Sequence, residues 1–107
     1  LEDYYVGWSS GEGFAVEFDL GEVRRLDRLR FWHGGDRPSL RVVALGADGA
    51  EKVVAERPAK PLGHPKDVPV VEVELDDLKA NGLRLEFGRR QPGSPDFELA
   101  EVDIWRR

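Results

Sequence analysis

Two histidines of this chain each stand three residues before an aspartate, His33 before Asp36 and His64 before Asp67. Imidazole and carboxylate groups are ligands of divalent transition metals, so the two pairs could hold one such ion between them. A neutral imidazole beside the guanidinium of Arg37 could instead hydrogen-bond a pair of hydroxyl groups on a ligand. The third interpretation is ordinary polarity of exposed loops, because the spacing by itself is not specific to any chemistry.

Aromatic rings and further arginines accompany these histidines. Trp32 precedes His33, and Phe97 follows a proline-containing loop that begins with Arg89 and Arg90. An aromatic ring can stack on the apolar face of a sugar, while guanidinium groups donate hydrogen bonds to its hydroxyls. The structural alternatives are that Trp32 packs between a sheet and a loop, and that the arginine pair forms a solvated rim. The candidate ligand-binding residues are Trp32, His33, Asp36, Arg37, His64, Arg89, Arg90 and Phe97.

Hydrophobic alternation predicts the elements that would position these residues. From Phe14 to Leu20 every second residue is a large apolar one, which is the two-residue period of a half-buried strand. Comparable patterns, bounded by Gly, Pro, Asn or Asp, predict the other strands. The predicted strands are 14–20, 29–33, 40–47, 52–56, 70–75, 83–87 and 97–106.

Turn signals separate the predicted strands. Gly21 predicts the end of the first strand, residues 48–49 (Asp-Gly) a tight hairpin, and residues 81–82 (Asn-Gly) another turn. Residues 77–80 are the one candidate for a helical turn, and the four prolines of residues 58–69 predict a long loop. Because no longer segment has a helical period, we predict an all-β chain, an antiparallel β-sandwich of the jelly-roll type.

If every connection reverses the chain direction, successive loops alternate between the two ends of the sandwich. Residues 7–13, 33–38, 58–67 and 89–97 then fall at one end. These segments hold both histidines, six of the seven prolines, and five basic against four acidic residues, whereas the whole chain has a net charge of −5. Proline-stiffened loops on a rigid scaffold are typical binding surfaces, so we expect a ligand at this end.

Length and composition bound the class of protein. The 107 residues suffice for a single domain, 1–107, and a composition of 40% hydrophobic and 35% charged residues is typical of a folded chain. The net negative charge argues against nucleic-acid binding, and no apolar stretch approaches the ~20 residues that would insert into a membrane. Cysteine is absent, which excludes disulfides and thiolate chemistry. Because the chain begins at Leu1 without methionine, we expect a module excised from a larger protein.

Five short motifs follow one another along the chain. They are an acidic residue leading to Trp in 3–8, an aromatic strand ending in Leu-Gly at 14–21, a strand ending in Asp-Gly at 42–49, Gly-Leu-Arg-Leu at 82–85, and the closing strand 99–105. In this order they resemble the discoidin, or coagulation-factor type C, domains and the related family 32 carbohydrate-binding modules. That resemblance implies the galactose-binding-like jelly roll.

The resemblance also implies a function. Members of these families are non-catalytic modules that bind glycans, or in some cases phospholipid or protein, through loops at one end of the jelly roll. Many hold a structural calcium ion, for which Asp3 and Glu101 are the matching residues here. The cysteine pair of the animal domains is absent, which favours the bacterial, carbohydrate-binding branch. An extracellular or cell-surface location and an attached catalytic or membrane domain are the further expectations.

Three functions are therefore compared below. The leading hypothesis is binding of a glycan or polysaccharide through the loops. The second is a structural or docking module that packs against a neighbouring catalytic domain; it would show an exposed apolar patch on the strand faces and no pocket at the loops. The third is a metal-dependent enzyme using the two His–Asp pairs. The sequence contains no nucleophile-elbow, phosphate-loop or zinc-protease motif, so we predict that the chain is not an enzyme.

Overall fold

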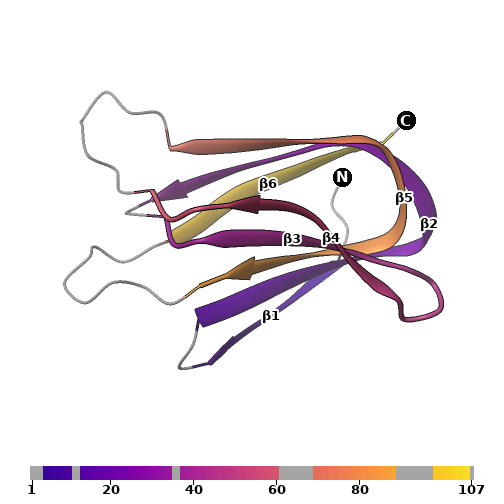
Figure 1. The fold of residues 1–107 in the computed structure, drawn as a ribbon, viewed down its shortest axis with the longest axis horizontal. Coiled ribbons are helices and arrows are strands. Elements are labelled where there is room, and N and C mark those ends of the chain that lie inside the picture. The colour runs from indigo at the N-terminus through magenta and orange to yellow at the C-terminus, as the bar shows by residue number, and fades with distance from the viewer. Residues whose placement is uncertain (1–3, 11–12, 35–36, 61–68, 89–97, 107) are drawn as a thin grey trace.

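The computed structural model describes residues 4–10, 13–34, 37–60, 69–88 and 98–106. These residues form six strands (Figure 1), which confirms the prediction of an all-β chain. Within the same ranges there is no helix, and so none that could cross a membrane. The strands are β1 (Tyr4–Ser10), β2 (Gly13–Gly34), β3 (Leu40–Leu45), β4 (Glu51–Arg57), β5 (Val70–Phe87) and β6 (Glu98–Arg106).

Two strands are much longer than predicted, because each one bends instead of ending. β2 has 22 residues and β5 has 18, and both curve round at the same end of the molecule (Figure 1). The bend of β2 contains Gly21 at φ 81°, and the bend of β5 contains Asp76 and Asp77 at φ 52° and 64°. The register shifts in this region, and pairing resumes where Arg24 lies opposite Ala80.

Three predictions at the bends are therefore wrong. The expected strand end at Gly21, the turn at 81–82 and the helical turn at 77–80 all lie inside continuous strands. Left-handed φ angles supply the local change of direction, and the pairing of β2 with β5 stops at Asp19 and resumes at Arg24 beyond the bend. The predicted strands 14–20 and 29–33 are thus the two halves of β2.

The bends divide the strands into two layers. The first half of β2 lies between β1 and the second half of β5, which is followed by β3 and then by β4 at the edge. The second half of β2 lies between the first half of β5 and β6. All pairs are antiparallel, so a five-stranded and a three-stranded layer form the predicted sandwich.

The core lies between the layers and is rich in aromatic residues near the ends of β2 and β5. Phe31 is fully buried and meets Phe87 edge to face, with ring centroids 5.8 Å apart. Phe14 stacks on the other side of this cluster, 4.9 Å from Phe87. Burying one such side chain contributes about 1.5–3 kcal/mol to the stability of the fold. The cluster therefore holds the ends of β2 and β5 firmly in place. The most deeply buried side chains of the whole core are Phe31, Leu26, Leu29, Leu83, Leu85, Val42 and Val73.

The two ends of the sandwich differ as predicted. The bends and the β3–β4 hairpin lie at one end (Figure 1), where Gly49 adopts φ 86° and the Gly46 amide donates to the carbonyl of Ala50 at 2.8 Å. At the other end lie residues 33–34, 37–40, 57–60, 69–70, 87–88 and 98–99, which we call the loop end. Of the predicted loops 58–67 and 89–97, residues 61–67 and 89–97 lie outside the described residues.

Candidate functional site

The structure describes four of the predicted site residues, Trp32, His33, Arg37 and Glu101. His33 and Arg37 lie at the loop end, Trp32 is adjacent to it, and Glu101 belongs to β6. The remaining predictions fall outside the described residues; they are Asp3, Asp36, His64, Arg89, Arg90 and Phe97.

A continuation of the β3–β4 ladder builds one side of the loop end. Leu40 pairs with Arg57 in the ladder, and three residues further along each segment Arg37 pairs with Lys60 in the same register. The two backbone hydrogen bonds of this bridge are 3.0 and 2.9 Å long. Pro58, which has no N–H to donate, lies between the two pairs and interrupts the ladder of hydrogen bonds. The two segments nevertheless continue in the same register on both sides of it.

The side chain of Arg37 is only 6% exposed, unlike the solvent-facing donor that the sequence predicts. Its Nη1 donates to the carbonyl of Pro38 at 3.0 Å and its Nη2 to the carbonyl of Pro58 at 2.8 Å. Burial, and then the charge of Arg57, lower the pKa of the Arg37 guanidinium, which nevertheless stays protonated because arginine titrates far above neutral pH. The buried Arg37 side chain therefore links the segment that contains Pro38 to the segment that contains Pro58.

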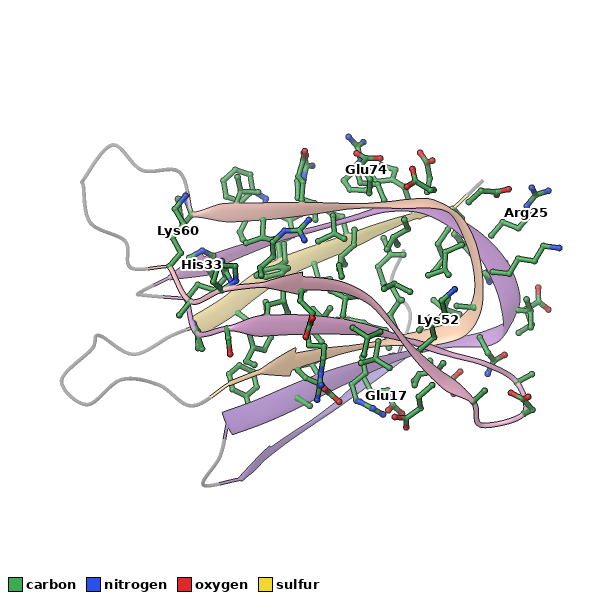
Figure 2. All side chains as sticks on the ribbon, viewed as in Figure 1. Glu17, Arg25, His33, Lys52, Lys60 and Glu74 are labelled. Atoms are coloured by element: carbon green, nitrogen blue, oxygen red, sulfur yellow. The ribbon has the colours of Figure 1, made fainter. Side chains whose placement is uncertain are left out.

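His33 is the penultimate residue of β2 and follows the buried Phe31 by two positions. Its amide donates to the carbonyl of Pro69 at 2.9 Å, and its half-buried ring lies 6.3 Å from the ring of Phe31 at an angle of 55°. Figure 2 shows His33 and Lys60 at the same end of the sandwich. Two residues that are far apart in sequence, His33 and Lys60, thus lie at the same end, while the convergence of the other predicted donors stays a prediction.

The side chain of Trp32 is partly accessible to a ligand. It is 36% exposed and follows the buried Phe31, so its ring lies on the outer face of the three-stranded layer. Phe31 pairs with Val102 and His33 with Leu99, which places two residues of β6 opposite the single Trp32. β-Bulges of this kind redirect side chains and are frequent beside functional sites.

Glu101, the predicted calcium ligand, is one of the two bulge residues and is exposed. Its predicted partner Asp3 is not described. Among the described residues, no three His, Cys, Asp or Glu side chains are grouped so that they could hold a metal ion. Calcium binding by Asp3 and Glu101 stays a prediction.

An open groove of about 600 Å³ lies at the loop end across β3, β4 and β5. Sequence reasoning missed this groove, because register brings its polar groups together from three strands. Arg41 pairs with Glu56 across the β3–β4 ladder and with Glu86 across the β3–β5 ladder. The lining residues are Ser39, Leu40, Arg41, Glu56, Arg57, Pro58, Glu86, Phe87 and Gly88.

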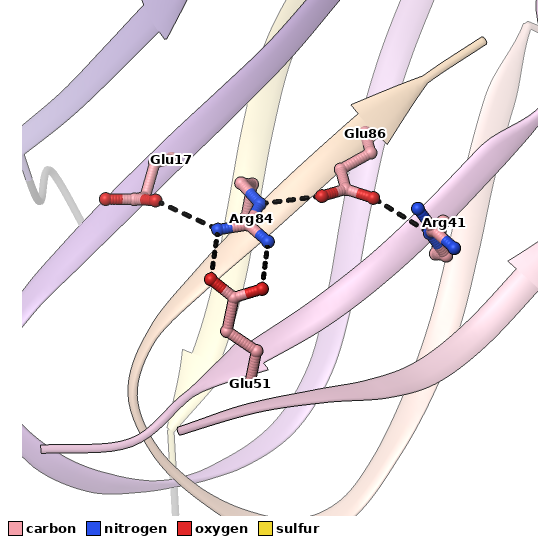
Figure 3. Close-up of polar contacts among 5 residues, drawn as sticks. All are labelled: Glu17, Arg41, Glu51, Arg84 and Glu86. Carbon is pink, nitrogen blue, oxygen red and sulfur yellow. Dashed lines mark hydrogen bonds and ion pairs between the residues drawn. The ribbon is translucent and has the colours of Figure 1, made fainter. Parts of the chain in front are cut away.

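The walls of the groove are held in place. The Gly88 amide donates to the carbonyl of Ser39 at 2.8 Å, and a Cβ at Gly88 would collide with the Ser39 side chain. Arg41 Nε donates to Glu86 at 2.8 Å, and the other oxygen of Glu86 accepts from Arg84 Nε, also at 2.8 Å (Figure 3). Groove side chains fixed in this way need little further ordering when a ligand binds.

Arg84 extends this arrangement over the outer face of the five-stranded layer (Figure 3). Its Nη1 and Nη2 bind the two carboxylate oxygens of Glu51 at 3.0 and 2.6 Å, and Glu17 lies 3.6 Å from Nη1. Hydrogen bonding to Arg84 lowers the pKa of Glu51. For Glu86, burial acts to raise the pKa, but hydrogen bonds from Arg41 and Arg84 outweigh it and lower the value. The groove carboxylate Glu86 is therefore ionised at neutral pH.

No protein-family model matches this sequence, and no curated protein matches it either. Solved structures do match. A family 32 carbohydrate-binding module from C. perfringens NanJ, in complex with galactose, is 18% identical with a TM-score of 0.65, covering 94% of this chain and 73% of that one. The lectin domain of lectinolysin, complexed with Lewis b antigen, is 20% identical with a TM-score of 0.65, covering 96% and 72%.

A third match is chitosan-binding module 2 of a chitosanase/glucanase from a Paenibacillus species, in complex with chitotriose. It is 13% identical with a TM-score of 0.67, covering 94% of this chain and 77% of that one. The chain therefore has the discoidin-like jelly-roll fold of the family 32 carbohydrate-binding modules, as the sequence motifs predicted.

Proposed function

We propose that this chain is a non-catalytic carbohydrate-binding module whose glycan occupies the groove at the loop end. The observation that carries the proposal is the groove itself, an open site of about 600 Å³ on a fold whose solved examples include complexes with galactose, Lewis b and chitotriose. Resemblance to these modules supports an extracellular bacterial setting and attachment to a catalytic or membrane domain.

The groove has the chemistry that a sugar requires. Arg57 offers N–H donors, Glu56 offers acceptors, and the Ser39 hydroxyl can do both. The exposed ring of Pro58 adds apolar surface for the C–H groups of a pyranose ring. This combination of donors, acceptors and apolar area suits a ligand that carries a hydroxyl on almost every carbon.

The other candidates extend the same site. His33 would hydrogen-bond a hydroxyl, and Trp32 would stack on a part of the glycan that extends beyond the groove onto the three-stranded layer. Asp36, His64, Arg89, Arg90 and Phe97 lie outside the described residues, and they stay proposed ligand contacts on the basis of the sequence alone. Arg37 would act indirectly, by holding the segments that carry Arg57 and Lys60.

Screening the protein on a glycan array tests the proposal, and calorimetry then measures its affinity for the best ligand. We expect Glu56→Ala to weaken binding while the melting temperature stays unchanged, because the Glu56 side chain is exposed. Trp32→Ala should also weaken binding, with a lower melting temperature because Trp32 is only 36% exposed. Val23→Ala is the matched control, since Val23 is 52% exposed but lies at the opposite bend. Failure of the unmodified protein to bind any glycan would refute the proposed function.

The docking alternative is less well supported. It requires an apolar patch on a strand face and no pocket at the loop end. In the described part of the chain the large hydrophobic side chains with high exposure are Val23, Trp32 and Val53, which lie at the bend, the loop end and edge strand β4 respectively. Of the two His–Asp pairs in the enzyme hypothesis, only His33 is described, and a metal assay on the purified protein is its test.

A structural calcium ion bound by Asp3 and Glu101 is a separate proposal. Its support is the resemblance together with the exposed position of Glu101 in the β6 bulge. Calcium ions bind carboxylate oxygens and stabilise the folded state that holds them. The thermal unfolding midpoint should therefore rise with calcium and fall with EDTA, and Glu101→Gln should remove this response.

A further inference from the structure

Three positive charges gather on the paired segments of the loop end. Arg37 and Lys60 are partners in the backbone bridge, and Arg57 pairs with Leu40 three residues away. The guanidinium of Arg37 binds the carbonyl of Pro58, the residue that follows Arg57. Arg57 is also close enough for its charge to contribute, after burial, to the lowered pKa of Arg37.

Most of the other arginines in the described ranges are neutralised by carboxylates; Arg28 and Arg106 are the exceptions. Five of them are each paired with at least one carboxylate: Arg24, Arg25, Arg30, Arg41 and Arg84. Within the described ranges, Arg37, Arg57 and Lys60 form no ion pair with a carboxylate. Arg37 donates to two proline carbonyls, and Arg57 Nη1 donates to the carbonyl of Glu56 at 3.0 Å. Because a backbone carbonyl carries no net charge, these hydrogen bonds do not neutralise the arginines.

The carboxylates of the groove do not cancel them. Glu86 is shared by Arg41 and Arg84. Glu56 also lines the groove, but Arg57 donates to its backbone carbonyl and forms no ion pair with its carboxylate. The exposed side chain of Arg57 therefore lines the groove with most of its N–H groups still available, and the exposed Lys60 lies three residues beyond it.

We propose that the glycan bound in the groove carries a carboxylate, which Arg57 and Lys60 contact. The inference rests on the proposed function and names the class of sugar: an acidic one, either a hexuronate or a sialic acid. A guanidinium binds a carboxylate with two parallel hydrogen bonds, which a neutral hydroxyl cannot match. An anion placed here would also relieve the mutual repulsion of Arg37 and Arg57.

Calorimetry with matched sugars tests this inference. Sialyllactose is compared with lactose, and trigalacturonate with its uncharged methyl ester. At least one acidic sugar should bind about tenfold more tightly than its neutral counterpart, because a hydrogen bond to a charged group contributes about 1.5 kcal/mol or more. The difference should shrink when NaCl is raised from about 50 to about 500 mM, since salt screens exposed charges. Tighter binding of sialyllactose would identify the carboxylate as that of a sialic acid, and tighter binding of trigalacturonate would identify it as that of a hexuronate.

Charge-removing variants localise the effect. Arg57→Gln and Lys60→Gln should each weaken binding of the acidic sugar several-fold, and should therefore narrow the difference in affinity between the acidic sugar and its neutral counterpart. Lys52→Gln is the matched control, because Lys52 is exposed on the same strand β4 at its far end. If neutral and acidic sugars bind equally, or if Arg57→Gln has no effect, the acidic-sugar inference is overturned and glycan binding stands. If no sugar of either kind binds, the proposed function fails and takes this inference with it.

Discussion

Replacing Arg37 by methionine tests whether one buried guanidinium holds the loop end together. Methionine keeps the apolar stem but removes both donors, so the carbonyls of Pro38 and Pro58 lose their partners. A hydrogen bond to a charged group contributes about 1.5–3 kcal/mol, and part of this is offset because the substitution also removes a charge from a buried position. We therefore expect Arg37→Met to lower the free energy of unfolding by roughly 2–4 kcal/mol.

For a domain of this size, a loss of that magnitude lowers the melting temperature by roughly 10 °C or more, which circular dichroism measures directly. Arg57→Met is the matched control: Arg57 is exposed and makes a single bond to a neighbouring carbonyl, so its loss should cost less than about 0.5 kcal/mol. Arg37→Lys should recover only part of the stability, because an ammonium group lacks the planar fork that reaches two carbonyls. Equal stability of Arg37→Met and the unmodified protein would refute this account of Arg37.

Two further predictions concern the five-stranded layer. Gly82→Ala should destabilise the protein by more than 1 kcal/mol in urea unfolding, because the new Cβ would lie 2.7 Å from the Phe18 carbonyl oxygen; unchanged stability would contradict this tight approach. The lowered pKa values of Glu51 and Glu86 mean that their stabilising effect is complete above the ordinary value of 4.5 and is lost as pH falls through the folded-state values. Unfolding measured from neutral pH down to about pH 3 should therefore show a smaller loss of stability in Arg84→Met than in the unmodified protein, and equal slopes would argue against the ion pairs.

Local pattern predicted the strands well, because alternation records which face is buried. Phe14 to Leu20 and the opposite faces of Phe31 and Trp32 appear in the structure as the sequence indicates. The bends were mistaken for turns, since Gly21 and Asp76 report a local φ angle and not whether pairing resumes beyond it. Whether pairing resumes after the bend depends on the partner strand, which local sequence does not describe.

The site was predictable only in its location. Reversal of the chain at each connection placed His33 and Lys60 at one end, and the structure agrees. The groove depends on Glu56 and Arg57, which belong to a predicted strand and its edge and carry no motif. The burial of Arg37 likewise results from carbonyls 1 and 21 residues away, a contact that composition cannot reveal.

The two bent strands have a consequence for how this fold tolerates change. Because β2 and β5 pair with each other in both layers, one alignment of two strands sets the inward side chains of the whole sandwich. An extra residue in either straight half would turn that half's apolar side chains toward solvent. At the bends the alignment already shifts between Asp19 and Arg24, so an insertion there would be absorbed as a longer loop. Length variation among proteins of this architecture should therefore gather at the bends and the loop end, leaving the straight halves constant in length.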